Sequence, residues 1–341
     1  LMMACLANAQ STKKVLFIGN SYTSVNDLPL MVSSMATNSG DVLIYDSNLP
    51  GGSRFLNHVT NATTLSKINS NTWDYVVLQA QSQEAALSQT QMEQEVFPYA
   101  TTLSNLVRQN NSCSQPLFYM TWGRQNGDPN NCPFIPWVCT YQGMDNVIKS
   151  SYLAMAENNL AELAPAGAVW RYLRDSNPSI NLYSPDESHP SMEGSYAAAC
   201  ALYTMIFKKD PTVLTWNSTL SASVASTIRM AAKTIVFDEM ATWDFTVNPA
   251  VAHFTENING NAVTFDNTNA AYDSLVWDFG DGTTSVETNP MHTFIENGMY
   301  VVSLTVVKCG KSATMTKTLA ISGDLHLNQW ETKNALSVFR N

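Results

Sequence analysis

Short apolar runs alternate with longer segments of helical period from Lys14 to about Trp243. Strands of a parallel sheet are buried on both faces, and their sequences therefore read as short, continuous apolar runs. Five such runs are predicted as strands, at residues 15–18, 42–45, 75–78, 117–120 and 168–170. Together with the helical segments between them, they predict an α/β domain with a parallel sheet over residues 14–243.

The helical segments carry their own boundary signals. In the clearest segment, seven apolar side chains fall on one face, and Pro165 is expected to end the helix. The seven are Met144, Val147, Ile148, Tyr152, Met155, Leu160 and Leu163. Ser191 is suited to be the N-cap of the last helix of the domain, and Glu193 complements the dipole in its first turn. We therefore expect one helix to end at Pro165 and another to begin directly after Ser191.

The pattern changes after Trp243. Gly, Asn, Thr and Asp become frequent, and short segments alternate with a period of two, as in residues 262–265 and 300–306. This period indicates half-buried antiparallel strands. Residues 244–249 are then a linker, and residues 250–322 form a small all-β sandwich.

One set of motifs in the second region is specific. The stretch Trp277-Asp278-Phe279-Gly280-Asp281-Gly282 is followed by Asn289-Pro290, His292-Thr293-Phe294 and Gly298-Met299-Tyr300. In this order the motifs resemble the PKD (polycystic kidney disease type) module, which implies an immunoglobulin-like sandwich over residues 250–322. Asp278 and Asp281 suggest either a calcium site or tight turns, and Asp-Gly pairs favour the turns.

Composition narrows the class of protein. The 341 residues are 45% hydrophobic, which is enough for two domains and a sizeable core. The formal net charge is -10, and no basic run could follow a phosphate backbone. Nucleic acid and anionic membrane surfaces are therefore not expected as partners, and no segment has the roughly 20 apolar residues that span a bilayer.

Both ends of the sequence carry targeting features. Residues 1–10 are apolar with small residues at Ala7 and Ala9, which predicts the remnant of a secretory signal cleaved after Ala9. A frayed terminus and lipidation at Cys5 are the alternatives. Residues 323–341 end in a stretch that resembles the opening of a secretion-sorting module of the Bacteroidetes kind, the alternative being a linker or frayed end. We expect an exported protein that is secreted, periplasmic or attached to the cell surface.

The six cysteines are compatible with an oxidising compartment. Cys132 and Cys139 flank a loop whose ends a disulfide could close, and Cys113 is a competing partner. Cys200 lies in an alanine-rich helical segment and is predicted to be a buried, small apolar residue. The sequence has no C-x-x-C pair and no H-E-x-x-H motif, so we predict no structural zinc.

A serine follows the first predicted strand, in Gly19-Asn20-Ser21-Tyr22-Thr23. Parallel α/β folds keep their sites at the carboxyl edge of the sheet, which is where Ser21 would emerge. The nucleophile elbow of α/β-hydrolases is G-x-S-x-G, but Thr23 replaces the second glycine and the serine lies on the first strand. These departures argue against an α/β-hydrolase.

A second polar block, Asp186-Glu187-Ser188-His189-Pro190, directly precedes the last helix of the domain. A carboxylate three residues before a histidine can hold one imidazole nitrogen and present the other to a serine. Ser21, Asp186 and His189 are therefore the candidate catalytic residues. An exposed histidine in a capping loop is the alternative for His189.

The arrangement of a nucleophile on the first strand and a base near the end of the domain resembles that of the SGNH (GDSL-like) hydrolase family. The resemblance implies a three-layer flavodoxin-like sandwich and an oxyanion hole made by the Ser21 N–H, a glycine N–H and a side-chain amide. Gly51 and Gly52 follow the second strand, and either fits the glycine. The third block departs from the family's G-x-N-D, because Gln81 of Gln79-Ala80-Gln81-Ser82 stands where Asn is usual. Gln81 offers the same amide donor on a longer stem, or it serves only buried backbone groups.

Other polar and aromatic residues follow the fourth strand. Trp122 could stack on a sugar or pack against an acyl group, and Arg124 could donate to hydroxyls or a carboxylate. A structural tryptophan and a salt-bridged arginine are the alternatives. His58 is interpreted as structural.

The sequence thus predicts a secreted serine esterase that works through an acyl-enzyme without a metal or cofactor. An SGNH-like domain joined to a PKD-like module resembles carbohydrate esterases that deacetylate glycans, with the sandwich as a spacer or as a unit that docks on glycan or protein. A lipase or thioesterase is the enzymatic alternative. A non-catalytic glycan-binding or adhesion protein is the alternative from another class.

Overall fold

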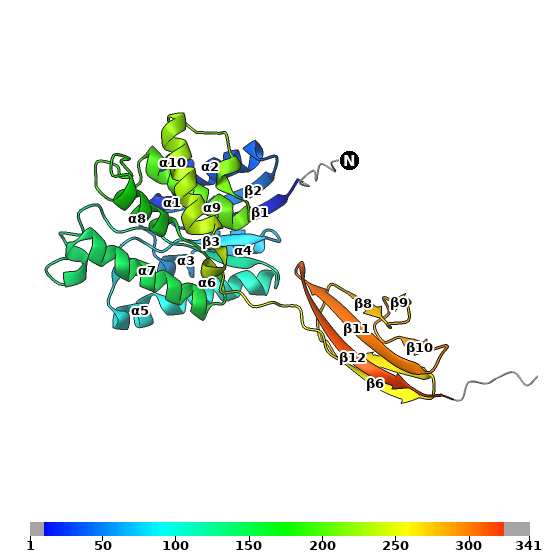
Figure 1. The fold of residues 1–341 in the computed structure, drawn as a ribbon. Coiled ribbons are helices and arrows are strands. Elements are labelled where there is room, and N and C mark those ends of the chain that lie inside the picture. The colour runs from blue at the N-terminus through cyan, green and yellow to red at the C-terminus, as the bar shows by residue number, and fades with distance from the viewer. Residues whose placement is uncertain (1–9, 324–341) are drawn as a thin grey trace, which may run out of the picture. The chain divides into compact units, whose positions relative to one another are not determined.

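The computed structural model describes residues 10–323, which divide into two compact units, one up to residue 246 and one from 247 (Figure 1). Apart from Gln10 and Gly323, the predicted signal remnant and the predicted sorting tail lie outside the described residues. Within residues 10–323, no helix is both long enough and apolar enough to cross a membrane.

The first unit is built on a five-stranded sheet in the order β2-β1-β3-β4-β5. Every pair of neighbouring strands is parallel. The strands are β1 (Thr12–Ile18), β2 (Val42–Asn48), β3 (Tyr75–Leu78), β4 (Gln115–Tyr119) and β5 (Glu162–Ala164). The predicted α/β class with a parallel sheet is confirmed, and the strands' carboxyl ends share one edge.

Helices cover both faces of this sheet (Figure 1). One group packs around α9 and the other around α6. The first group is α2 (Leu28–Asn38), α8 (Ala166–Ser176), α9 (Met192–Phe207) and α10 (Ala222–Ala232); the second is α3 (Phe55–His58), α4 (Ala62–Asn69), α5 (Gln89–Glu95), α6 (Phe97–Asn110) and α7 (Tyr141–Asn158). Short helical turns are α1 (Ser21–Ser24), η1 (Val25–Asp27), η2 (Glu84–Ala86), η3 (Pro136–Cys139), η4 (Pro211–Val213), η5 (Lys233–Phe237) and η6 (Met240–Trp243).

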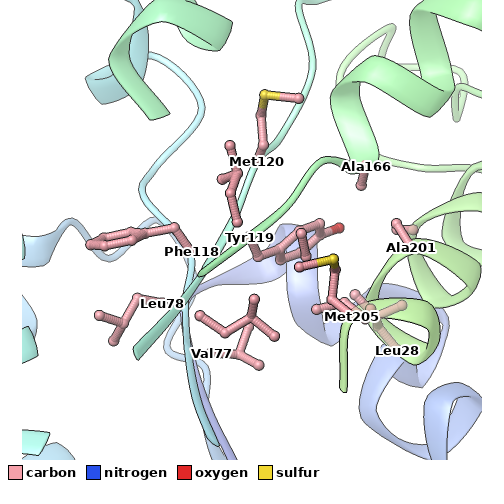
Figure 2. Packing of buried hydrophobic residues seen from close by; sticks show 14 of the residues in the cluster. Leu28, Val77, Leu78, Phe118, Tyr119, Met120, Ala166, Ala201 and Met205 are labelled. Carbon is pink, nitrogen blue, oxygen red and sulfur yellow. The ribbon is translucent and has the colours of Figure 1, made fainter. Parts of the chain in front are cut away.

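The core fills the space on both sides of the sheet. In Figure 2, Phe118 and Leu78 point to one side, while Tyr119 points to the other, toward Ala201 and Met205 of α9. All five side chains are fully buried. Because successive strand residues alternate between faces, the apolar residues of β3 and residues 116–119 of β4 supply both layers of core.

The predicted fifth strand is wrong. Residues 168–170 lie in α8, and the fifth strand is Glu162–Ala164, inside the segment that was expected to be helical. Helix α7 ends at Asn158, where the Asn159 side chain donates to the carbonyl of Met155 and Leu160 takes a positive φ of 47°. The local hydrogen bond of an asparagine competes with helix continuation, and it ends α7 before Pro165 is reached.

Helix α9 follows the predicted cap. The Ser191 side chain accepts from Gly194 N–H, and Glu193 lies in the first turn, as expected. Every residue from Gly194 to Phe207 is buried, including Cys200, the cysteine predicted to be a small core residue. A helix that is apolar on all sides must be enclosed, and α2, α8 and α10 enclose α9.

The second unit is an antiparallel sandwich of two sheets, ordered β10-β7-β6 and β12-β11-β8-β9. Its strands are β6 (Phe254–Asn259), β7 (Ala262–Asn267), β8 (Ser274–Asp278), β9 (Thr284–Ser285), β10 (Met291–Thr293), β11 (Gly298–Lys308) and β12 (Lys311–Ile321). Phe254, Phe265 and Trp277 meet in its core, with ring centroids 5.0–6.1 Å apart. The predicted all-β sandwich is confirmed.

Asp278 and Asp281 hold turns between β8 and β9. Asp278 Oδ1 accepts from Gly280 N–H at 2.9 Å, and Asp281 Oδ1 accepts from Thr283 N–H at 3.0 Å. Gly280 and Gly282 have φ values of 77° and 90°, which glycine adopts without strain. The turn interpretation of the Asp-Gly pairs is confirmed.

Candidate active site

Ser21, His189 and Asp186 form one hydrogen-bonded chain. Ser21 begins α1 directly after β1, and its Oγ lies 2.8 Å from His189 Nε2. His189 Nδ1 lies 2.5 Å from Asp186 Oδ2. The order nucleophile, imidazole, carboxylate is the one in which an imidazole can take a proton from a serine while the carboxylate fixes its tautomer.

The acid–base loop (residues 183–190) contains several hydrogen bonds among its own residues. Asp186 Oδ1 accepts from the N–H groups of Ser188 and His189 at 3.1 and 3.0 Å, while Oδ2 faces the imidazole. Ser184 N–H donates to the carbonyl of His189, and Glu187 takes a positive φ of 59°. One carboxylate therefore shapes the loop and orients the ring at the same time.

Asp186 remains ionised in this loop. Partial burial raises its pKa, but hydrogen bonds from the His189 ring and from the two backbone N–H groups outweigh burial and bring the pKa below its ordinary value of 3.8. The side chain is 50% exposed, so solvent also supports the charge.

The nucleophile loop (residues 19–23) is fixed instead by distant side chains. Gln79 is fully buried, and its Oε1 accepts from Asn20 N–H at 2.9 Å and from Thr23 Oγ1 at 2.8 Å. Asn20 in turn accepts from Tyr22 N–H and donates through Nδ2 to the carbonyl of Ser53. Behind Ser21, these bonds join the nucleophile loop to Gln79 and to Ser53, which follows the two candidate glycines.

Gly19 and His58 complete this support. A Cβ on Gly19 would lie 2.5 Å from Gln79 Oε1, so glycine is required by the close approach of the glutamine rather than by a positive φ. His58 is buried, and its Nε2 lies 2.9 Å from the carbonyl of Gly19, while Nδ1 lies 2.9 Å from Thr64 Oγ1. Because a carbonyl only accepts, Nε2 carries the proton. The structural interpretation of His58 is confirmed.

Trp122 is buried beneath the site, which contradicts the expectation that it contacts substrate. Its ring stacks on Tyr22 at 5.2 Å and on Trp170 at 3.6 Å, so both faces are covered. Its Nε1 donates to the carbonyl of Ser188. Trp122 therefore braces both loops, since Tyr22 also packs edge-on against the His189 ring and shares a 2.6 Å hydrogen bond with Ser188 Oγ.

The two candidate glycines lie in an exposed turn. Ser53 N–H donates to the carbonyl of Pro50, which makes Gly51 and Gly52 the central residues of the turn. Gly52 has a φ of 68°, and a Cβ at either position would meet nothing within 4 Å. The turn's own hydrogen bond uses neither glycine N–H.

Gln81 has its carbonyl oxygen committed to the backbone. Its Oε1 accepts from Gln83 N–H at 2.7 Å and from Glu84 N–H at 3.0 Å, which caps η2. Nε2 lies 3.2 Å from Gln83 Oε1. The Gln81 Nε2 group therefore points away from the backbone N–H groups that Oε1 accepts from. Gln81 also lines the same pocket as Gly52.

Arg124 forms an ion pair with a buried acid. Its Nη1 is 3.3 Å from Asp128 Oδ1, and its side chain is 21% exposed. Among the described residues, the buried Nε of Arg124 has no hydrogen-bond partner. Arg124 is salt-bridged, as one alternative held, and its predicted contact with substrate stays a prediction.

Cys132 and Cys139 are disulfide-bonded, the first of the two pairings considered for Cys139. The bond closes the loop that contains η3, whose Val138 carbonyl accepts from Asp128 N–H at 2.7 Å. The loop is thereby tied to the segment that carries Arg124.

Sequence reasoning missed Gln79, Tyr22 and Ser188 as residues that position the site. Gln79 and Tyr22 lie inside motifs that the sequence analysis describes. Their partners Asn20 and Ser188 are 59 and 166 residues away, so no local spacing predicts these contacts. The available signal was residue type: a glutamine directly after an apolar strand needs buried hydrogen-bond partners.

Residues 246–322 match the family model of the PKD domain. The second unit is a PKD domain. A microbial collagenase of Vibrio alginolyticus is 42% identical over 69 residues, which is 18% of this chain and 8% of the collagenase. Collagenase ColA of Bacillus cereus is 61% identical over 33 residues, 10% of this chain and 3% of that protein. The chain thus spans less than a tenth of the length of either relative.

Solved structures also resemble the first unit. A DUF4886 family protein of Bacteroides uniformis is 17% identical, covers 66% of this chain and 95% of its own, and has a TM-score of 0.57, which shows a shared fold. A protein of Slackia heliotrinireducens assigned to the SGNH hydrolases is 25% identical over 56% of this chain and 97% of its own, with a TM-score of 0.47.

Proposed function

We propose that this protein is an esterase that hydrolyses ester bonds through an acyl-enzyme on Ser21. The observation that carries the proposal is the chain of hydrogen bonds from Ser21 Oγ through the His189 imidazole to Asp186. A serine hydroxyl is a weak nucleophile unless a base removes its proton, and a neutral imidazole at 2.8 Å is such a base.

His189 Nε2 takes the proton from Ser21 Oγ as this oxygen attacks the ester carbonyl. Asp186 stabilises the imidazolium that forms. His189 then donates the proton to the leaving alcohol, whose departure leaves the acyl group on Ser21. In the second half of the reaction, His189 deprotonates a water molecule as that water attacks the acyl carbonyl. His189 then returns the proton to Ser21 Oγ as the acid is released.

The negative charge on the tetrahedral intermediate needs fixed donors. We assign them to the Ser21 N–H, to a glycine N–H of the 51–52 turn and to Gln81 Nε2. Gly52 is favoured over Gly51 because it lines a pocket together with Gln81. Each such donor typically contributes about 2.7–4 kcal/mol to lowering the barrier.

The substrate class proposed is acetylated glycan, with the PKD domain as a spacer or as a unit that docks on glycan or protein. An exported location is supported by the Cys132–Cys139 disulfide, because such bonds persist in oxidising compartments. The pocket beside the proposed oxyanion donors is lined by polar as well as apolar side chains, and polar ones such as Gln83 and Asn131 can contact the hydroxyls of a glycan.

The first test is Ser21→Ala, measured on 4-nitrophenyl acetate. We expect kcat/KM to fall by at least about 10⁴-fold with unchanged thermal unfolding. The folded wild type should also be labelled by a fluorophosphonate probe, and Ser21→Ala should not. Full activity in Ser21→Ala would disprove the mechanism, and an unlabelled, inactive wild type would favour the adhesion alternative.

Substrate class is tested separately by acetate release from a panel of acetylated polysaccharides. Faster hydrolysis of long-chain acyl esters than of any sugar acetate would instead favour a lipase or thioesterase.

A further inference from the structure

A pocket of about 330 Å³ adjoins the proposed oxyanion donors. Gly52 and Gln81 lie on its border, and the pocket extends from them toward η2, α5 and the disulfide-closed loop. An acetyl group would fill only a small part of this volume. If Ser21 is the nucleophile, as proposed above, the pocket has room for the part of the substrate that carries the ester.

One wall of the pocket is polar and fixed. Asp128 Oδ2 accepts from Gln83 Nε2 and from Asn131 Nδ2, both at 2.7 Å, and Asp128 is 1% exposed. Burial raises the pKa of Asp128, but these two hydrogen bonds and the charge of Arg124 outweigh it and bring the pKa below 3.8. The amides of Gln83 and Asn131 are therefore held in place by a permanent carboxylate.

The cation that lines the pocket already has carboxylate partners. Arg54 Nε lies 3.5 Å from Glu84 Oε1, and its Nη2 lies 3.3 Å from Glu95 Oε2. Glu84 is buried, which raises its pKa to about 7 against the opposing effects of the Gln81 N–H and Arg54. Arg54 can therefore donate to neutral hydroxyls from a fixed position, but a carboxylate ligand would have to compete with two acidic residues.

Another part of the pocket lining is apolar. It consists of Ala86, Leu87, Ile135, Val138 and Met144. Ile135 and Val138 belong to the loop closed by the Cys132–Cys139 disulfide, and Trp137 of that loop donates from Nε1 to the carbonyl of Ala86. A lining that combines apolar side chains with fixed amides and an engaged guanidinium suits a sugar ring, which has C–H faces and hydroxyl edges.

We infer that this pocket binds the neutral sugar ring that bears the ester and discriminates against sugars that carry a carboxylate. Gln83 and Asn131 contact the hydroxyls, the apolar part of the lining covers the ring, and Glu95 with Asp128 repels a uronate.

The experiment compares three esters on the full chain: 4-nitrophenyl acetate, an acetylated methyl glucoside and an acetylated methyl glucuronoside. The readout is kcat/KM for each sugar acetate divided by kcat/KM for 4-nitrophenyl acetate with the same variant. We expect wild type to prefer the glucoside over the glucuronoside. Gln83→Ala should lower the glucoside ratio by about tenfold, since the substrate loses a hydrogen-bond donor.

Charge selectivity is tested with Glu95→Lys, which should shift preference toward the glucuronoside by up to about fivefold. The matched control is Glu93→Lys, which makes the same charge change on an exposed residue of α5 outside the pocket lining and should keep the wild-type ratios.

Failure of this inference is separable from failure of the esterase proposal. Equal ratios for both sugars in wild type, or unchanged ratios in Gln83→Ala and Glu95→Lys, would overturn the sugar pocket while Ser21-dependent hydrolysis of 4-nitrophenyl acetate persisted. A preference for 4-nitrophenyl octanoate that Ile135→Asp abolishes would also overturn it, because the pocket would then bind acyl chains. If Ser21→Ala instead kept full activity, the esterase proposal itself would be disproved.

Discussion

The two loops that meet at Ser21 and His189 are built in opposite ways. The nucleophile loop is buried and held by side chains from far along the sequence, Gln79 and His58 above all. The acid–base loop is more exposed, and local bonds to the Asp186 carboxylate set its shape beside bonds from Trp122 and Gln125. Tyr22 and Trp122 then join the two loops from below.

Because of this contrast, substitutions in the two loops should affect catalytic activity and folding stability to different extents. A change in the acid–base loop should alter the reaction with little effect on folding, because Asp186 is half exposed. A change beneath the nucleophile loop should alter both, because buried groups lose their partners. Three substitutions test this contrast.

The largest expected effect on the reaction is that of Asp186→Asn. An asparagine can still accept from the N–H groups of Ser188 and His189, but its amide then faces His189 Nδ1 and favours the wrong tautomer. We expect kcat/KM on 4-nitrophenyl acetate to fall by about 10⁴-fold, with the free energy of unfolding changed by less than about 1 kcal/mol. A loss below tenfold, or unfolding of the variant, would contradict the independence of this loop.

Gln79→Leu should show the opposite balance. It keeps the volume but leaves Asn20 N–H and Thr23 Oγ1 without their acceptor, and each lost partner costs about 1–3 kcal/mol. We expect the free energy of unfolding to fall by about 2–4 kcal/mol and kcat/KM to fall by about 10–100-fold, because Ser21 is less well placed. Gln94→Leu, on the exposed side of α5, is the control and should change neither quantity. Wild-type stability in Gln79→Leu would show that the nucleophile loop holds itself.

The smallest effect is a pH dependence beneath the nucleophile loop. Burial lowers the pKa of His58, although the Gly19 carbonyl opposes this, so the folded protein takes up a proton at lower pH than the unfolded chain does at its ordinary 6.5. His58 therefore costs stability as the pH falls below 6.5. Urea unfolding between about pH 8 and about pH 5 should show the wild-type advantage over His58→Gln shrinking as the pH falls.

Comparing wild type with His58→Gln also removes the effect of a second titrating group, Glu84. Glu84 has a raised pKa of about 7, so its contribution to stability is lost as the pH rises from 4.5 through 7, in the opposite direction. Because wild type and His58→Gln both contain Glu84, its contribution cancels in their difference. A difference that stays constant with pH would mean that His58 is as readily protonated in the folded protein as in the unfolded chain.

The same contrast explains what the sequence could predict. Asp186 and His189 are three residues apart, and their geometry is local, so residue type and spacing were sufficient to pair them. Ser191 as an N-cap and the Asp-Gly turns are local in the same sense. The parallel sheet was predictable because four of its strands carry short apolar runs, and in β1, β3 and β4 these runs are buried on both faces.

The wrong sequence-based predictions concern residues whose roles depend on tertiary contacts. The third block was interpreted through Gln81 alone, while Gln79 beside it holds the nucleophile loop, since only the fold brings it under Asn20. Trp122 at a strand end looked accessible, but Trp170 and Tyr22 cover both of its faces. The fifth strand has only three residues, too short for a periodic signal, and the more strongly apolar residues after it form a helix.

The enclosure of α9 has a consequence for how the protein comes to be assembled. His189 lies three residues before a helix whose side chains from Gly194 to Phe207 are all buried, and one of the helices that cover it, α10, is synthesised afterwards. Until α10 arrives, this segment is exposed to water and prone to self-association. Because His189 is joined to this helix, we expect the imidazole to reach Ser21 only after α9 is enclosed, so recovery of Ser21 labelling by a fluorophosphonate during refolding should report a late step.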